Sequence, residues 1–224
     1  MALSPEEIAQ GVENLWQLKH VALWEAFLQA KGHPQPVDPA VFREALVSDP
    51  DPRNRRAGAE ILGELGLRAE IPLLRRALED PDSFVRGAAA ISLGKLKDAS
   101  SLSLLARFSE GKDLHPREKE QFLIARLMLA DPRTDRAVLD QLADASSPWG
   151  RAHAVELIGF SARTELAPTL LESLEDARET GQGTVRTDRQ TGCQTRKVLV
   201  QDVAVEALQR LTGKTFAYDM WGSE

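Results

Sequence analysis

The sequence predicts an all-α fold, a right-handed α-solenoid of about five stacked helix pairs. The main evidence is a phrase that occurs twice, as DPDPRNRRAGAEILGELG from Asp49 and as DPDSFVRGAAAISLGKLK from Asp80. The same spacing continues past the phrase, because Arg76 recurs as Arg107. Self-similarity at a period of about 20 to 50 residues is typical of repeat architectures. The repeating unit is therefore the 31 residues that separate Asp49 from Asp80.

The first helix of each unit is encoded locally. In the stretch from Arg55 to Gly66, Ala59, Leu62 and Leu65 follow helical spacing and form a narrow apolar face. The carboxylate of Asp51 can accept hydrogen bonds from the free N–H groups of the first turn. Gly66 can adopt the left-handed conformation that ends a helix. The phrase thus predicts a helix with a defined start and end.

A second helix follows in IPLLRRALED, where Ile71, Leu74 and Leu78 form the buried stripe. The same pattern in VDPAVFREALVSD, from Val37, predicts the second helix of a preceding unit. A divergent unit is predicted from Arg117, with these apolar residues on its two helices: Leu123, Leu127 and Ala130, then Val138 and Leu142. The register continues in a further helix pair, whose second helix carries Leu170 and Leu174, and in a last helix from Val203.

We expect one repeat domain with capped ends, because the first and last units of a solenoid must cover an open core. The predicted parts are an N-terminal cap over 1–36, repeats over 37–176, an insertion loop or hairpin over 177–199, and a C-terminal cap helix and tail over 200–224. Trp16, Trp24 and Phe27 could instead form an exposed docking face. The capping role is the favoured interpretation of these aromatic residues.

The composition predicts a soluble cytoplasmic protein. The chain has a net charge of −6, with 42% hydrophobic and 28% charged residues. Its N-terminus lacks the basic and apolar segments of a signal peptide, and no uncharged apolar run is long enough for a bilayer. The acidic balance argues against a nucleic-acid partner, which requires basic residues along its whole track.

No catalytic constellation stands out, so we expect no enzyme, no cofactor and no metal site. The histidines are scattered without metal-ligand spacing, at His20, His33, His115 and His153. Cys193 is the only cysteine, and its neighbours predict an exposed thiol in a loop.

The repeated pattern supports a family resemblance. Asp-Pro-Asp, then Ala-x-x-Ala, then Leu-Gly-x-Leu resembles the short HEAT-like repeat first associated with phycobilin lyases. The ending LTGKTFAYDMW, from Leu211, resembles the C-terminus of many bacterial proteins of that type. The resemblance covers residues 38–221 and is strongest over 49–110. It implies an α-solenoid whose second helices line a concave face, but such repeats serve many partners.

The second helices offer a candidate partner-binding column. Arg76, Arg107 and Glu172 share one repeat position, Asp140 is aligned with them in the divergent unit, and Arg75 lies beside Arg76. Because the column runs from positive to negative, a partner with its own charge asymmetry fits it better than a nucleic acid. The alternative is that these residues are merely solvated helix faces.

The insertion over 177–199 is longer than an ordinary connection between helices. Alternating β-branched residues in 184–187 and 195–198, with a turn at 190–192, favour a short hairpin. Its basic residues are candidate partner contacts, although a loop without a ligand is the alternative: Arg186, Arg189, Arg196 and Lys197.

The sequence therefore predicts a non-enzymatic scaffold or adaptor that binds a protein or peptide partner on its concave face. A lyase-like enzyme or accessory subunit of the phycobilin-lyase type, implied by the resemblance, is the alternative. Nucleic-acid binding is less favoured. Oligomeric state is left open.

Overall fold

The computed structural model describes residues 20, 22, 23, 25–27, 39–111, 114–144, 146–188 and 192–215, with the backbone alone over 182–188 and 192–196. The chain divides into two compact units, Met1–Leu129 and Ala130–Glu224. The prediction of a single repeat domain stays a prediction. Helices dominate both units, and the predicted class, an all-α solenoid, is confirmed.

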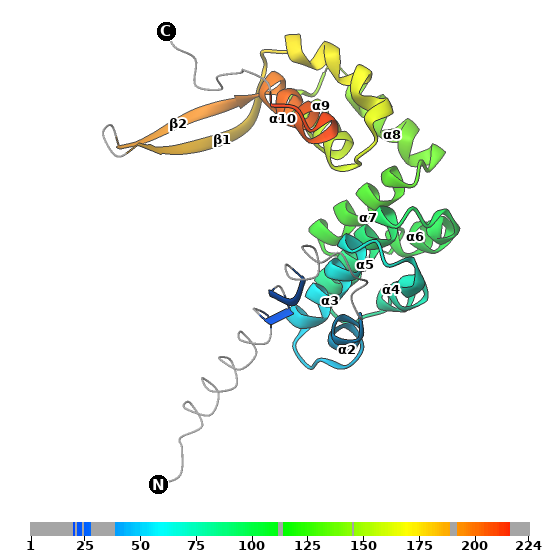
Figure 1. Ribbon diagram of the computed structural model, residues 1–224. Helices are drawn as coiled ribbons and strands as arrows, with labels where there is room; N and C mark the ends of the chain where they lie inside the picture. The colour runs from blue at the N-terminus through cyan, green and yellow to red at the C-terminus, as the bar shows by residue number, and fades with distance from the viewer. Residues whose placement is uncertain are drawn as a thin grey trace. The chain divides into compact units, whose positions relative to one another are not determined.

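The first unit consists of two rows of helices (Figure 1). The row of first helices contains α3 (Pro52–Glu64), α5 (Ser83–Lys95) and α7 (Pro116–Met128), which pack side by side. The row of second helices contains α2 (Ala40–Ser48), α4 (Ile71–Ala77) and α6 (Leu102–Ser109). Short 3₁₀ turns, Arg68–Glu70 and Ala99–Ser101, lead into α4 and α6. Each first helix is thus followed by a second helix that packs against the row.

The two rows share one apolar core. Leu62 and Leu93 of the first helices and Leu74 and Leu105 of the second helices are all fully buried. Burying such a side chain contributes about 1.5–3 kcal/mol. The stripe predicted by the helical spacing is therefore the stabilising face of the repeat.

The N-terminal stretch contributes to the same core. Leu23 and Phe27 are helical, only 2% and 7% exposed, and belong to the core cluster of the first unit. Their burial agrees with the capping role expected for this stretch. Trp16 and Trp24 lie outside the described residues.

Small residues let the first helices approach closely. A Cβ atom at Gly63 would lie 2.5 Å from Ser92 Oγ, and one at Gly94 would lie 2.7 Å from Met128 Sδ. Ser92 Oγ also donates a hydrogen bond of 2.8 Å to the carbonyl oxygen of Ala59. The glycine of the Leu-Gly-x-Leu pattern is therefore required by packing between neighbouring repeats.

The predicted helix starts are confirmed. Asp51 accepts a hydrogen bond of 2.9 Å from the amide of Arg53. Asp82 accepts bonds of 2.9 and 3.1 Å from the amides of Phe84 and Val85. Each aspartate therefore caps free N–H groups of the helix that it precedes.

The helix ends follow one rule, which corrects one prediction. Gly66 has φ of 68°, as expected, and Lys97, Ala130 and Ala162 follow the later first helices with φ of 55°, 56° and 54°. Ala130 was predicted to lie on a helix with Leu127, but α7 ends at Met128. Ala130 instead adopts the left-handed conformation that closes the helix.

An arginine links the first two full repeats. Arg55 of α3 donates through Nε and Nη2 to the carboxylate of Asp80, at 2.8 and 2.9 Å. Its Nη1 donates to the carbonyl oxygens of Asp49 and Pro50, at 3.0 and 3.3 Å. One guanidinium therefore joins the segment that opens its own repeat to the segment that opens the next.

Arg86 repeats this arrangement with a different anion. Its Nη1 donates to the carbonyl oxygen of Asp80 at 2.8 Å, and its Nε and Nη2 donate to Glu118 of α7 at 2.5 and 2.9 Å. The Glu118 side chain is only 1% exposed. Asp113, which precedes the α7 cap His115 by two residues as Asp80 precedes the α5 cap Asp82, lies outside the described residues. The buried carboxylate of Glu118 on α7 thus binds α7 to α5.

The second unit contains α8 (Pro132–Ala143), α9 (Pro148–Phe160) and α10 (Val200–Thr212). Helix α9 packs against both α8 and α10. A Cβ atom at Gly159 would lie 2.8 Å from the Cβ atom of Ala207, so α9 and α10 approach closely. Arg151 of α9 forms an ion pair of 3.4 Å with Asp176, which follows the pattern of Arg55 and Asp80.

One predicted second helix takes a tighter form. Residues Thr164–Glu175, which contain Leu170 and Leu174, form a 3₁₀ helix. Pro168 lies inside this segment and has no N–H group to donate. Leu170 is nevertheless fully buried, as its repeat position predicts.

In the described part of the chain, no helix is both long and apolar enough to cross a membrane.

Replacing Glu118 by Gln tests the link between α5 and α7. Because this leaves the guanidinium of Arg86 without its buried anion, we expect the free energy of unfolding to fall by about 3–5 kcal/mol. Urea denaturation measures the change. Glu110→Gln, at an exposed position, is the matched control and should stay within about 0.5 kcal/mol of the natural protein. Equal stability of the two variants would contradict the role of Glu118.

Candidate partner-binding surfaces

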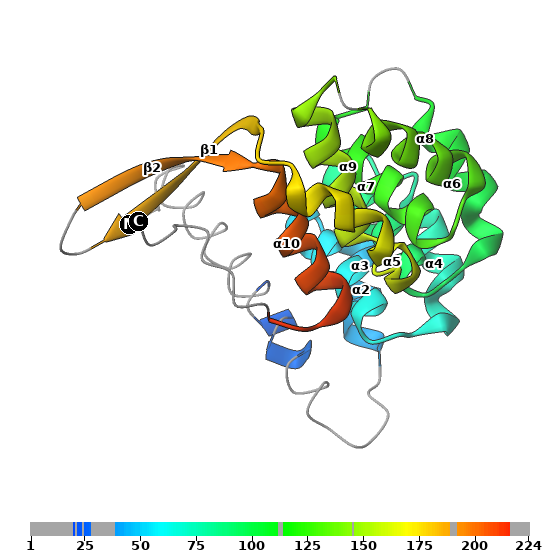
Figure 2. The same cartoon turned by 90° about the horizontal axis from the view of Figure 1, so that it is seen from above.

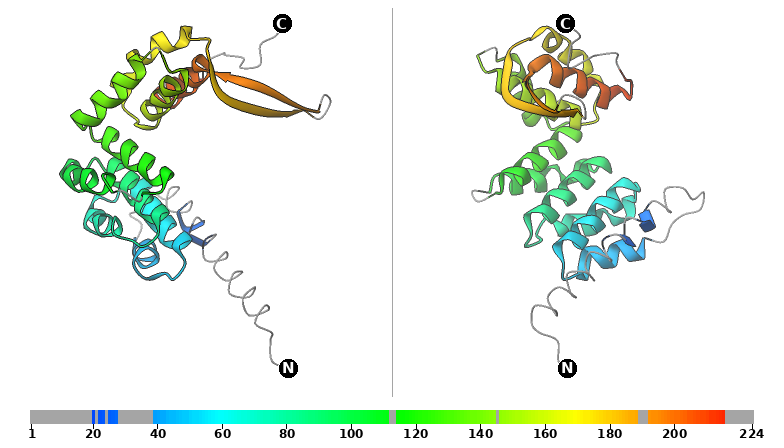
Figure 3. Two further views of the ribbon diagram at one scale, coloured as in Figure 1. Left: turned by 180° about the vertical axis from the view of Figure 1, so that it is seen from behind. Right: turned by 90° about the vertical axis from the view of Figure 1, so that its left-hand side faces the viewer.

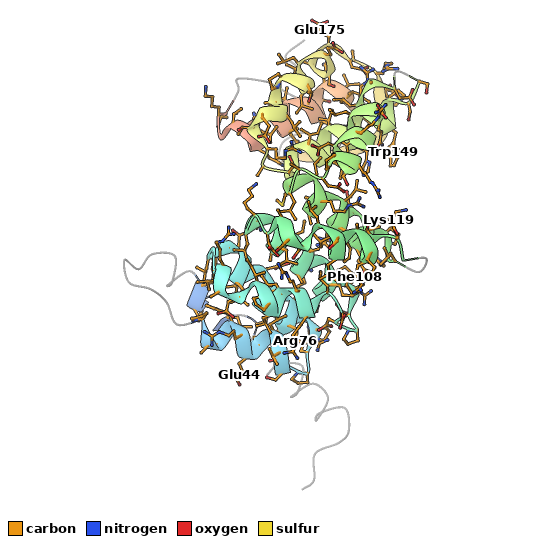
Figure 4. The ribbon with its side chains drawn as sticks, turned by 90° about the vertical axis from the view of Figure 1, so that its right-hand side faces the viewer. Glu44, Arg76, Phe108, Lys119, Trp149 and Glu175 are labelled. Carbon is orange, nitrogen blue, oxygen red and sulfur yellow. The ribbon has the colours of Figure 1, made fainter. Side chains whose placement is uncertain are left out.

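The solvent-facing side of α2, α4 and α6 is here named the second-helix face. Its exposed residues include Val41, Glu44, Val47, Arg76, Glu79, Arg107 and Glu110. Figure 4 shows Glu44 on α2, Arg76 on α4 and Phe108 on α6 along one side of the first unit. The repeat therefore presents a continuous surface of mixed polar and apolar character.

Arg75 is half-buried and binds a carboxylate of the same chain. Its Nε and Nη2 donate to the carboxylate of Asp98 at distances of 2.7 to 3.0 Å, and its Nε also donates to Ser101 Oγ at 2.9 Å. Asp98 belongs to the loop that follows α5 in the next repeat. The structure thus gives Arg75, predicted as a partner contact, an intramolecular partner.

The Asp98 carboxyl is held in its charged form. Burial opposes ionisation, but hydrogen bonds from Ser100, Ser101 and Arg75 outweigh the burial, so the pKa of Asp98 lies below its usual value. The Asp98 side chain is only 8% exposed. This ion pair therefore couples α4 to the following repeat.

Arg76 differs from its neighbour. Its side chain is exposed, and among the described residues its guanidinium forms no hydrogen bond and no ion pair. It borders an open cavity of about 230 Å³, whose lining residues are Leu46, Val47, Leu73, Arg76, Ala77, Glu79 and Asp80. The cavity is therefore lined by apolar side chains, by the cation of Arg76 and by the carboxylates of Glu79 and Asp80.

Arg107 holds the same position on α6. Its guanidinium carbon lies 5.1 Å from the centre of the Phe108 ring, and the side chain is exposed. It forms no ion pair within the described part of the chain. The second-helix face therefore carries two arginines, on successive repeats, whose charges no carboxylate of the described chain neutralises.

Asp140 and Glu172 lie in the second unit, so the four-residue column with Arg76 and Arg107 stays a prediction. The Asp140 side chain is 72% exposed, and its Oδ2 lies 3.7 Å from Nε of Arg136, one turn earlier on α8. Glu172 is exposed and lines an open cavity of about 540 Å³ beside Arg178. Both carboxylates are accessible to solvent.

The insertion forms an antiparallel hairpin of β1 (Glu179–Asp188) and β2 (Gly192–Leu199), longer than the strands that the sequence predicted. Its register pairs Thr184 with Arg196 and Arg186 with Gln194, so the two arginines are diagonal neighbours on the ladder. Lys197 Nζ lies 2.6 Å from Glu179 Oε2, and both side chains are exposed.

The predictions for Arg189 and Cys193 of the hairpin have different outcomes. Arg189, a predicted contact, lies outside the described residues. Cys193 was predicted to lie in a loop, but its backbone belongs to β2 and pairs with Thr187. The alternation of β-branched residues marked the centres of the strands, whereas pairing extends to their less distinctive ends.

One exposed aromatic surface was not assigned from the sequence. Trp149, near the start of α9, is 56% exposed, and its ring stacks on His153 at 5.3 Å with an angle of 4° between the planes. The side chain of Ser147 caps this helix through the amide of Gly150. Ser147 and Pro148 are residue types that favour a helix start, whereas the exposure of Trp149 depends on tertiary structure.

Among the described residues, no group of three or more His, Cys, Asp or Glu side chains could hold a metal ion.

Comparison with known proteins identifies the repeat. A family model of HEAT repeats matches residues 39–120, which span α2 to α6 and the start of α7. The resemblance to HEAT repeats that the sequence pattern indicated is therefore confirmed. No curated protein matches the chain.

One similar solved structure is the complex of CpcE and CpcF of phycocyanin lyase from Nostoc sp. PCC7120. The identity is 21%, the alignment covers 82% of this chain and 68% of that chain, and the TM-score is 0.44.

Replacing Asp98 by Asn tests the ion pair with Arg75. We expect the free energy of unfolding at neutral pH to fall by about 1.5–3 kcal/mol, the range for a hydrogen bond to a charged group. Because the folded pKa of Asp98 lies below the unfolded value of about 3.9, its stabilisation is complete above that value and is lost as the pH falls through the folded pKa. Urea denaturation across this pH range measures the effect.

The exposed Asp140→Asn variant is the control and should leave the dependence of stability on pH unchanged. An Asp98→Asn protein that loses as much stability on acidification as the natural protein would contradict this role of Asp98.

Proposed function

We propose that this chain, whose residues 39–120 are HEAT repeats, is a non-enzymatic scaffold or adaptor that binds a protein or peptide partner on its second-helix face. The observation that carries the proposal is the state of Arg76 and Arg107. Both are exposed, occupy one repeat position, and form no ion pair with described residues.

Three other arginines of the repeats provide a comparison. Arg55, Arg75 and Arg86 each bind a carboxylate within the protein, at 2.5 to 3.0 Å. The repeats thus place carboxylates beside these three arginines, whereas no carboxylate of the described residues pairs with Arg76 or Arg107. Their accessible guanidinium groups support binding to an external carboxylate, for which arginine offers paired donors.

The cavity beside Arg76 also restricts the shape of the partner segment that can bind there. Val47, 57% exposed, and Leu73 form apolar walls next to the cation. An apolar side chain of a partner could fill this space while a neighbouring carboxylate meets Arg76. A partner segment with apolar and acidic residues in close succession fits both features.

The lyase-like role remains the alternative proposal for this chain. It predicts that the purified protein binds a bilin and changes its absorption spectrum. The scaffold proposal predicts no such change. The two roles can therefore be separated without knowledge of the partner.

Reversing the charge of Arg76 and Arg107 together tests the scaffold proposal. We expect the Arg76→Glu, Arg107→Glu protein to bind its partner at least about tenfold more weakly, equivalent to about 1.4 kcal/mol. Stability should change by no more than about 0.5 kcal/mol for each exposed site. Affinity capture from the native cell, followed by titration of the captured protein, measures the first effect, and thermal unfolding measures the second.

The matched control is Arg117→Glu, on the exposed first turn of α7, where a negative charge suits the helix dipole. This variant should capture the partner as well as the natural protein does. Equal capture by all three proteins would exclude the second-helix face as the binding surface.

A further inference from the structure

The hairpin of β1 and β2 is a sheet of only two strands. Figures 2 and 3 show that it extends away from α9 and α10 of the second unit. At its base, the amide of Val200 donates to the carbonyl oxygen of Arg178, and Thr180 Oγ1 donates to the carbonyl oxygen of Val198. No third strand pairs with β1 or β2 within the described residues. Two-stranded ribbons are marginal in water unless further strands or helices pack on them.

The distal ladder is regular. Pairing runs without interruption from Gly183 and Lys197 to Asp188 and Gly192, and the single irregularity lies between Glu179 and Gly183. Neither strand contains a proline. Of the devices that natural sheets use to block an edge, bulges and prolines are missing from the distal part of this ribbon, and charged side chains are present on β2 as Arg196 and Lys197. Each edge offers a row of backbone donors and acceptors.

The two strands differ in charge. Within Gly192–Leu199, β2 carries Arg196 and Lys197 and no carboxylate, whereas β1 carries Glu179, Asp188 and one basic residue, Arg186. The ion pair of Lys197 with Glu179 joins side chains that are 72% and 53% exposed, so it is weak and easily exchanged. The β2 edge is therefore the basic one.

We propose that the β2 edge binds an extended, acidic segment of a protein partner as a third strand of the sheet. Backbone hydrogen bonds would supply the affinity of this strand addition. Carboxylates of the segment would pair with Arg196 and Lys197. The inference rests on the proposed role of the chain as a binding module, but it assigns the hairpin its own ligand, apart from the second-helix face.

The charge of the β2 edge distinguishes three possible ligands, namely a second copy of the chain, a nucleic acid and an acidic polypeptide. In a second copy of the chain, a β2 strand would bring a second Arg196 and Lys197 beside the first pair, and like charges on neighbouring strands are unfavourable. A nucleic acid would meet the basic edge but cannot continue a ladder of peptide hydrogen bonds, and the chain as a whole carries a net charge of −6. An acidic polypeptide meets both requirements.

The test uses the full chain and a fluorescent ten-residue peptide in which pairs of adjacent Glu residues alternate with Thr-Val pairs, so that carboxylates lie on both faces of the added strand. We expect saturable binding by fluorescence anisotropy, with slowed amide hydrogen exchange across residues 192–199 in the complex. A peptide with the same charge, but with proline at alternate positions, should bind at least about tenfold more weakly, because proline cannot donate to the ladder. A Lys-for-Glu peptide should not bind.

Two protein variants complete the test. Arg196→Glu should weaken binding of the acidic peptide by about tenfold or more, whereas Arg76→Glu should not change it. Equal binding of the proline peptide would overturn the proposal, since the attraction would be only electrostatic. Absence of binding, binding of single-stranded DNA in place of the peptide, or a dimer in sedimentation that Arg196→Glu abolishes would also overturn it. None of these outcomes affects capture through Arg76 and Arg107, so the two proposals can fail separately.

Discussion

The bond between an arginine of one repeat and a carboxylate of the next is the interaction on which the first unit depends. Arg55 illustrates its geometry, because one guanidinium reaches the carbonyl oxygen of Asp49 and the carboxylate of Asp80. The planar group has enough donors to bind both in fixed positions. It thereby sets the position of each repeat relative to the last, and close packing at Gly63 and Gly94 becomes compatible with that position.

Two groups of arginines in the first unit contrast with each other. Those of the first group bind a carboxylate of a neighbouring repeat, as Arg75 binds Asp98 and Arg86 binds Glu118. Those on the second-helix face, Arg76 and Arg107, remain exposed. Residues with the same charge and nearly the same place in the sequence thus have different roles, one in building the stack and the other in its proposed contact with a partner.

Much of the repeat could be predicted because its signals are local. The caps at Asp51 and Asp82 and the left-handed end at Gly66 depend on neighbouring residues alone. The difference between Arg75 and Arg76 could not be predicted in this way. It depends on the position of Asp98, a partner in the following repeat. Ala130 was placed wrongly because alanine gives no local signal for the left-handed conformation that Gly66 announces.

The hairpin shows the same limit. Alternating residues around Val185 and Thr195 marked the centres of the strands, but pairing as far as Glu179 and Leu199 adds positions without that alternation. Its place beside α9 and α10 also depends on packing that no local pattern specifies. The sequence thus predicted that a hairpin could form but not how far its strands extend.

The most direct test of the proposed division among the arginines is amide hydrogen exchange of the full chain, free and bound to its captured partner. We expect binding to slow exchange in α4 and α6 more than in α3 and α5, because the contact forms around Arg76 and Arg107. Slower exchange confined to the first helices, with α4 and α6 unchanged, would contradict this expectation.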